Sequence, residues 1–210
     1  MTALFVLWTI LVRTVDVRPA GETGTVVGFA TLNGRFHQLT GVHMGLYNLT
    51  DWLGLVPVGV CLAFAGMGAA QLAHRKRLQK VDGDLLLLGG YYVAVIAGYL
   101  FFEAVPINYR PILIGGRAEA SYPSSTTLLV LAVMPTLTFQ VERRVRSKWC
   151  RQTVCLLAAL FSLFMVAGRL LSGVHWVTDI VGGILFSSGI FYLYRASVLL
   201  LVPQKGEGGL

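Results

Sequence analysis

The sequence predicts an all-α integral membrane protein, a six-helix transmembrane bundle with an interfacial helix between the first and second spans. Three observations support this fold class. Apolar runs of about 20 residues recur along the chain, long enough to cross a bilayer as helices. Only 13% of the 210 residues are charged, against about 25% in soluble domains. The basic residues gather in short segments between the apolar runs. We treat residues 1–210 as a single domain.

The first apolar run, from Met1 to about Val12, is the shortest, and we predict a helix that extends to about Val17. A signal peptide is the alternative, but no basic segment precedes the run and no small-residue cleavage site follows it. Residues 18–46 mix glycine and polar residues with apolar ones. This mixture predicts a loop followed by a short amphipathic helix that lies at the membrane interface.

Five longer apolar runs predict the remaining spans. They cover approximately residues 46–73, 85–105, 124–140, 153–167 and 179–202, and a short tail ends the chain. The second span begins at about Leu46 or at Trp52, which suits an interfacial anchor. Pro123 fits the first turn of the fourth span, because the N–H that proline lacks would be unpaired there anyway.

The two most basic connections follow spans two and four, at residues 74–80 and 142–151. Positively charged connections stay in the cytoplasm, so these two connections and both termini are predicted to be cytoplasmic. The connections after spans one, three and five then lie on the extracytoplasmic side. The net charge of +7 therefore indicates topology and contact with anionic headgroups. Nucleic acid is not expected as a partner, because basic and aromatic residues are not interleaved.

The three cysteines do not form a pattern that indicates a metal or a disulfide framework. Cys61 falls inside an apolar run, while Cys150 and Cys155 flank a basic segment. None has metal-ligand spacing with a histidine. We expect free thiols, no metal and no cofactor.

The segment Gly168–Asp179 carries the main chemical pattern. His175 and Asp179 are four residues apart, a spacing that places both on one face of a helix. An aspartate that accepts the Nδ1–H of a histidine leaves Nε2 free as a nucleophile or base. A purely structural hydrogen bond is the alternative reading of the pair.

Candidate phosphate-binding groups are predicted on the same outer face. Arg110 and Arg169 carry planar guanidinium groups that suit bidentate phosphate binding, although a membrane-edge arginine also simply reaches toward headgroups. The helix that starts at Pro123 offers free N–H groups and the positive end of its dipole, or a plain helix cap. Its first residues are the hydroxyl side chains Ser124, Ser125 and Thr126. Together these groups predict a phosphate that is attacked by histidine.

These residues resemble the signatures of the type 2 phosphatidic acid phosphatase superfamily. Its third signature, Ser-Arg, five residues, His, three residues, Asp, is matched by Arg169, His175 and Asp179. Arg110-Pro111 matches the end of the first signature, which is Lys, six residues, Arg-Pro. Pro123-Ser124 matches the start of the second, which is Pro-Ser-Gly-His.

The resemblance implies a mechanism and a substrate class. His175 would attack phosphorus and form a phosphohistidine, and Asp179 would orient it. Arg110, Arg169 and Ser124 would bind phosphate oxygens without a metal, and water would complete the hydrolysis. The implied substrates are lipid phosphates and diphosphates, such as phosphatidic acid, phosphatidylglycerophosphate and undecaprenyl diphosphate.

Three positions depart from the signatures. Glu103 stands where the first signature has lysine, Ser125-Thr126 replaces Gly-His in the second, and Gly168 replaces the serine of the third. A threonine hydroxyl is too weak an acid to protonate a leaving oxygen near neutral pH. An ionised Glu103 would also repel phosphate.

Several residues could compensate for these departures. Arg117 could supply the lost positive charge. Glu103 could be neutralised by Arg110 or Arg117, or be held protonated by burial and act as the acid. Glu119, His37 or His43 could reach in from the outer loops, although the two histidines also fit an interfacial amphipathic segment. A diphosphate substrate would need less help from an acid, because phosphate is a good leaving group.

Three functions are compatible with the sequence. The first is an extracytoplasmic-facing lipid phosphate or diphosphate phosphatase of a bacterial cytoplasmic membrane. The second is a lipid phosphotransferase that passes the phosphoryl group from His175 to a lipid acceptor. The third is a catalytically degenerate protein that binds or transports lipid phosphates. In each case the expected partners are a lipid phosphate and the surrounding membrane lipids.

Overall fold

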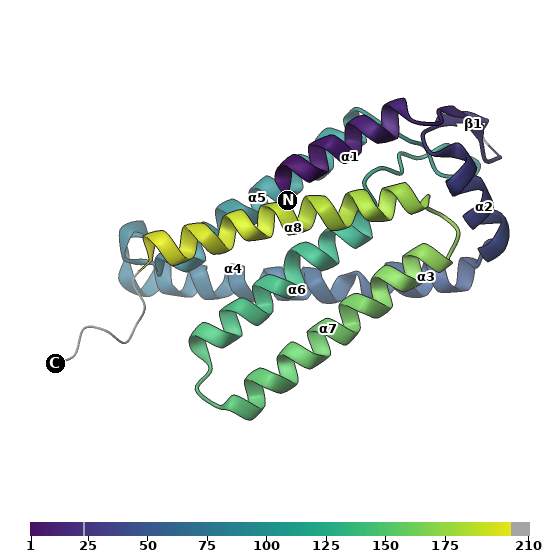
Figure 1. Cartoon of the computed structure of the whole chain (residues 1–210). Helices are drawn as coiled ribbons and strands as arrows, with labels where there is room; N and C mark the ends of the chain where they lie inside the picture. Colours follow the sequence, from purple (N-terminus) through teal and green to yellow (C-terminus); the bar gives the residue numbers. More distant parts are fainter. Residues whose placement is uncertain (23, 203–210) are drawn as a thin grey trace.

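A computed structural model describes residues 1–22 and 24–202, and the predicted tail at 203–210 lies outside the described residues (Figure 1). The elements follow one another as α1 (Thr2–Thr14), β1 (Arg18–Ala20), β2 (Thr25–Val27), α2 (Ala30–Thr40), α3 (Met44–Leu53), α4 (Leu55–Arg75), the 3₁₀ helix η1 (Leu78–Lys80), α5 (Gly83–Ala104), α6 (Ser125–Arg144), α7 (Lys148–Leu171) and α8 (Val177–Leu201). The predominantly helical architecture agrees with the sequence.

Five helical segments within the described residues are long and apolar enough to cross a membrane. They are Met44–Arg75, which contains both α3 and α4, Gly83–Ala104, Ser125–Arg144, Lys148–Leu171 and Val177–Leu201. A helix of 20 residues is about 30 Å long, which matches the hydrocarbon core of a bilayer. These helices correspond to the predicted spans two to six and identify an integral membrane protein.

Helix α1 is apolar but has only 13 residues, which gives a length of about 20 Å and leaves it short of a full span. It lies beside α8 (Figure 1). A Cβ atom on Gly189, midway along α8, would come within 3.2 Å of the Thr2 nitrogen, so α1 covers only one half of α8. The prediction of six spans is therefore not confirmed.

The segment between α1 and α3 is more structured than the expected loop and helix. Strands β1 and β2 form a short antiparallel hairpin, in which Arg18 pairs with Val27, in the part of this stretch where a loop was expected. Strands of three residues are too short to produce a detectable alternation of apolar and polar residues. Helix α2 lies in the region of the predicted amphipathic helix, and its location at the membrane interface stays a prediction.

Helix α6 occupies the centre of the bundle, where it packs against α4, α5, α7 and α8 (Figure 1). Its residues Leu128, Ala132 and Phe139 are buried in a cluster with Leu88 of α5 and Tyr194 of α8. The hairpin, α2 and the connection between α7 and α8 lie at one end of the bundle, whereas η1 and the connection between α6 and α7 lie at the other. We call the first of these the hairpin end.

Candidate active site

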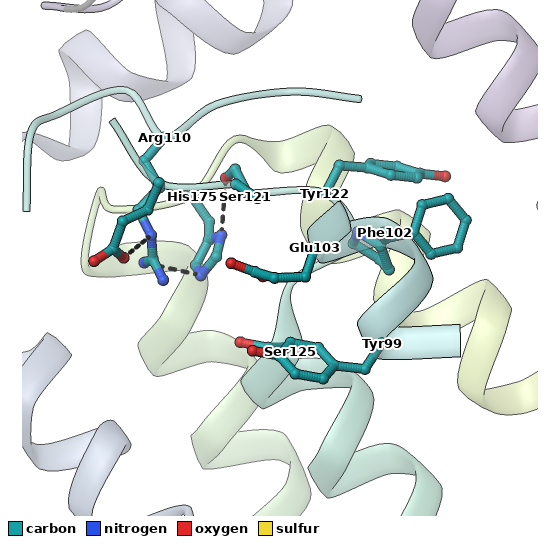
Figure 2. A pocket seen from close by; sticks show the side chains of 11 residues that line it. Tyr99, Phe102, Glu103, Arg110, Ser121, Tyr122, Ser125 and His175 are labelled. Atoms are coloured by element: carbon teal, nitrogen blue, oxygen red, sulfur yellow. Dashed lines mark hydrogen bonds and ion pairs between the residues drawn. The ribbon is translucent and has the colours of Figure 1, made fainter. Parts of the chain in front are cut away.

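A polar cavity of about 250 Å³ opens at the hairpin end (Figure 2). It lies where the end of α5, the loop 105–124, the start of α6 and the connection between α7 and α8 meet. Its polar and charged lining residues are Glu103, Arg110, Glu119, Ser121, Ser125 and His175, and its aromatic ones are Tyr99, Phe102 and Tyr122. Two parts of the chain, residues 99–125 and His175, therefore meet at one site.

His175 lies in the connection between α7 and α8, is only 4% exposed and lines the cavity. Its Nε2 atom is 3.3 Å from Nη1 of Arg110, and its Nδ1 atom is 3.0 Å from Oγ of Ser121. Burial lowers the pKa of His175 to about 4, the Arg110 charge adds to this effect, and Asp179 opposes it. The imidazole is therefore neutral near pH 7, with a ring nitrogen available as a nucleophile.

Asp179 does not bond His175 directly, which corrects the expectation from their spacing. The distance from His175 Nδ1 to Asp179 Oδ2 is 3.9 Å, too long for a hydrogen bond. The reason is that α8 begins only at Val177, so the two residues do not share a helical face. Trp176 is the N-cap, and Asp179 Oδ2 accepts the Trp176 N–H at 2.9 Å. The Ser121 hydroxyl bonds the aspartate instead, with its Oγ 2.5 Å from Asp179 Oδ2.

Arg110 lies in the cavity as predicted, and its side chain is almost fully buried. Its Nε is 3.1 Å from Oε2 of Glu119, which belongs to the same loop. The two atoms form an ion pair but are not aligned for a hydrogen bond, so Nε is a buried donor that has no acceptor among the described residues. A buried donor of this kind, next to a neutral imidazole, suits an anionic ligand.

Arg169 is placed differently from the prediction, because it does not line the cavity. Its Nη2 is 3.1 Å from Oδ1 of Asp51, and Nη1 donates to the Tyr47 carbonyl and the Thr50 hydroxyl. Both arginines contact the Tyr47 ring, whose centroid is 4.6 Å from Arg169 Cζ and 5.7 Å from Arg110 Cζ. Helix α3 therefore holds Arg169 beside the cavity rather than inside it.

The start of α6 supplies one of its three hydroxyl residues to the cavity. Ser125 lines it, whereas Thr126 lines a different, apolar groove. Ser124 is fully buried as the N-cap, its N–H donates to the Asp179 carbonyl, and its Oγ has no hydrogen-bond partner among the described residues. Thr126 is thus turned away from the position expected of an acid.

Two of the five compensating candidates lie in the cavity. Glu119 pairs with Arg110, and Glu103, at the end of α5, points toward the His175 ring (Figure 2). Within the described chain no cation pairs with Glu103. The remaining candidates are not among the lining residues: Arg117 is exposed in a turn, His37 packs edge-on against Trp176, and His43 bonds the Thr40 carbonyl.

An apolar groove of about 330 Å³ adjoins the cavity. It lies between α4, α5 and α6, and its lining includes Leu55, Ile96 and Leu129. Tyr99 and Ser125 line both the groove and the cavity, so the two spaces are neighbours. The combination suits a molecule with a charged head and an apolar tail.

The sequence did not single out Ser121, Asn108, Tyr47 or Asp51. Asn108 Nδ2 donates to Oδ1 of Asp179 at 2.9 Å, and Asn108 and Ser121 also share a backbone hydrogen bond. A single polar residue has no periodicity or spacing of its own that would mark it as functional. The one available signal was proximity to a motif, because Asn108 stands two residues before Arg110-Pro111 and Ser121 two residues before Pro123-Ser124.

Comparisons with known proteins agree with the fold and assign the family. The model of the PAP2 superfamily matches residues 2–201. Among solved structures, the chain is similar to the crystal structure of a transmembrane PAP2-type phosphatidylglycerolphosphate phosphatase from Bacillus subtilis, with a TM-score of 0.62 and 17% identity over 95% of this chain and 96% of that chain. The search of curated protein sequences found no match.

Proposed function

Since the chain belongs to the PAP2 superfamily, we propose that it is a lipid phosphate or diphosphate phosphatase that acts through a phosphohistidine on His175. One observation carries the proposal: a buried, neutral histidine has its Nε2 atom 3.3 Å from a buried arginine, in a polar cavity. A neutral imidazole nitrogen can attack phosphorus. A guanidinium group beside it can bind the phosphate oxygens and the charge that develops on them.

The apolar groove supports a lipid as the substrate. It shares Tyr99 and Ser125 with the cavity, and it lies between helices that are long and apolar enough to cross a membrane. An acyl or prenyl chain in the groove would place its phosphate near His175. The similar Bacillus subtilis protein is named for a phospholipid phosphate, which makes phosphatidylglycerophosphate one of the first substrates to test.

Glu103 is the best candidate for the acid that protonates the leaving oxygen. It points into the cavity toward the His175 ring, whereas Thr126 lines the groove (Figure 2). A carboxylic acid can serve as a general acid in its protonated form. Glu103 is exposed, so the burial that could have held it protonated is absent. For a diphosphate substrate this role is less important, because the leaving group is itself a phosphate.

The active site is proposed to face the extracytoplasmic side. The basic residues 74–80 and 142–151 lie at or beyond the opposite ends of α4 and α6 from the cavity. Positive connections favour the cytoplasm, and this supports the orientation. The proposed location of the protein is a bacterial cytoplasmic membrane.

The direct test is phosphate release by the purified full-length chain in lipid micelles. The panel contains phosphatidic acid, phosphatidylglycerophosphate and undecaprenyl diphosphate. We expect turnover of at least one lipid, and a loss of at least about 10³-fold in His175→Ala. His43→Ala is the matched control, since His43 lies outside the cavity. Equal rates for the wild type and His175→Ala would refute the proposal.

A lipid-phosphate-binding protein without turnover is the second candidate. It is favoured by the charge of the cavity, in which one arginine faces two glutamates, Glu103 and Glu119. Saturable binding of a lipid phosphate without release of phosphate, at every pH tested, would support this candidate. If phosphate instead appeared on an added lipid acceptor, the protein would be a phosphotransferase.

A further inference from the structure

We propose that Ser121 is a positioning residue that couples Asp179 to the nucleophile, in place of the direct histidine–aspartate contact that the motif spacing suggests. The inference rests on the proposed phosphohistidine function of His175. Ser121 comes from the loop before α6, 54 residues away from His175 in the chain. It is 2% exposed, so its hydroxyl group is held in a closed environment.

The distances place the Ser121 hydroxyl between the two other side chains. Its Oγ is 2.5 Å from Asp179 Oδ2 and 3.0 Å from His175 Nδ1, whereas those two atoms are 3.9 Å apart. No direct histidine–aspartate hydrogen bond can form at that separation. Any influence of Asp179 on the orientation of the imidazole ring therefore passes through the serine.

The hydrogen-bonding capacities determine which nitrogen carries the proton. A carboxylate only accepts, so Ser121 uses its single O–H to donate to Asp179. Toward His175 the serine oxygen can then only accept, which requires a proton on Nδ1. At the other end of the ring Arg110 can only donate, which requires a free lone pair on Nε2. Both contacts select the same tautomer, with Nε2 as the nucleophilic atom.

The aspartate is itself fixed, so the serine has a rigid partner. Asp179 is fully buried, its Oδ1 accepts from Asn108 Nδ2, and its Oδ2 accepts from the Trp176 N–H. The Ser121 backbone N–H donates to the Asn108 carbonyl at 2.9 Å. Ser121 is therefore held by two hydrogen bonds, one from its hydroxyl to Asp179 and one from its N–H to Asn108, which itself bonds Asp179.

The tautomer matters for the covalent step. The Nε2 lone pair forms the N–P bond while the P–O bond breaks. The electron pair of the P–O bond stays on the leaving oxygen, which takes the Glu103 proton in a monoester and leaves as phosphate in a diphosphate. The imidazole becomes a cation that keeps its Nδ1 proton, now a stronger donor to Ser121. Water then forms a new P–O bond, the N–P electrons return to Nε2, and the proton lost by water goes to solvent. Ser121 gains and loses no atom in either step.

Two isosteric variants test the hydroxyl. Ser121→Thr keeps the O–H and Ser121→Val replaces it with a methyl group of similar shape. We expect kcat to fall by about 10²-fold or more in Ser121→Val, with KM within about 3-fold of the wild type and most of kcat retained in Ser121→Thr. Ser187→Ala is the control for loss of a buried serine, since the Ser187 hydroxyl bonds only carbonyls within α8.

The split between kcat and KM separates positioning from substrate binding, because Ser121 also lines the cavity. A rise in KM with kcat unchanged would show that the serine binds phosphate directly, and would overturn the proposal. Equal kcat in the Thr and Val variants would overturn it as well. If neither variant folds, Ser121→Ala against Ser187→Ala gives the same comparison, with the same expected loss of kcat.

A second readout does not depend on activity. The protein has only four histidines, so the ¹⁵N resonances of His175 can be assigned by their loss in His175→Ala. We expect a protonated Nδ1 in the wild type and Ser121→Thr, and a shifted Nδ1 resonance in Ser121→Val. An identical Nδ1 resonance in all three proteins would overturn the serine contact. If the wild type releases no phosphate, the proposed phosphatase function fails, while this measurement still decides the contact.

Discussion

Arg169 Nη2 lies 3.1 Å from Asp51 Oδ1, so an ion pair joins the last turn of α7 to helix α3. The Arg169 side chain is 2% exposed and that of Asp51 is 60% exposed. A buried guanidinium group beside the polar cavity is therefore neutralised by an accessible carboxylate. A phosphate that bound Arg169 would compete with Asp51 for it.

The first prediction concerns this competition. Asp51→Asn removes the competing charge, so we expect KM for the lipid phosphate to fall by about 2- to 5-fold, in line with the modest energy of an ion pair in which one partner is exposed to solvent. Initial rates over a range of substrate concentration provide the measurement. Asp16→Asn, in the ion pair of Asp16 with Arg18, is the control and should leave KM unchanged. An unchanged KM in Asp51→Asn would assign Arg169 a purely structural role.

The second prediction is the pH dependence of activity. In the proposed mechanism His175 must be neutral to attack phosphorus, and burial lowers its pKa to about 4. The acidic limb of kcat/KM should therefore fall near pH 4, not near the value of about 6.5 for a free histidine. A pH profile from 3.5 to 8 checks this, and a limb centred near 6.5 would contradict the burial of the nucleophile.

The third prediction follows from the same pKa by linkage. Unfolded His175 binds a proton below about pH 6.5, whereas folded His175 does so only below about 4. Stability should therefore be lost as the pH falls through this window, since the unfolded state binds more protons there. Thermal unfolding at pH 7 and pH 4.5 measures the loss, which should be smaller in His175→Gln. Equal losses in both proteins would argue against a neutral buried histidine.

The fourth prediction tests Glu103 as the acid. Glu103→Gln keeps the size of the side chain and removes its proton, so we expect hydrolysis of a phosphate monoester to fall by about 10²- to 10⁴-fold. A diphosphate substrate should lose less. Glu142→Gln, an exposed change at the opposite end of α6, is the control. Wild-type rates and an unaltered pH profile in Glu103→Gln would mean that another group, or no group, protonates the leaving oxygen.

The fifth prediction concerns the apolar groove. Ile96→Trp fills part of it, so KM should rise for a long-chain lipid phosphate but not for a short, soluble phosphate ester. Val93→Trp places the same side chain on α5 outside the groove and should have no effect. Parallel kinetics on the two substrates provide the measurement. Equal effects of both substitutions would show that the groove does not hold the lipid chain.

Much of the architecture was predictable, because membrane helices are identified by local composition. Five predicted spans correspond to helices of sufficient length and hydropathy. The family was also predictable, since Arg169, His175 and Asp179 keep a specific spacing, and the family assignment is confirmed. Local composition could not identify the hairpin at Arg18–Val27, because its strands are three residues each.

The site itself was only half predictable. The sequence alone predicted that His175 and Arg110 belong to one site and that Glu103 stands where the first signature has a cation, because these are statements about which residue stands at which position. Tertiary structure decided that Ser121 lies between His175 and Asp179 and that Asp51 holds Arg169. It also decided that Thr126 faces the groove. The physical reason is that a hydrogen bond depends on ångström-scale placement of atoms from distant segments, and spacing along one segment does not encode it.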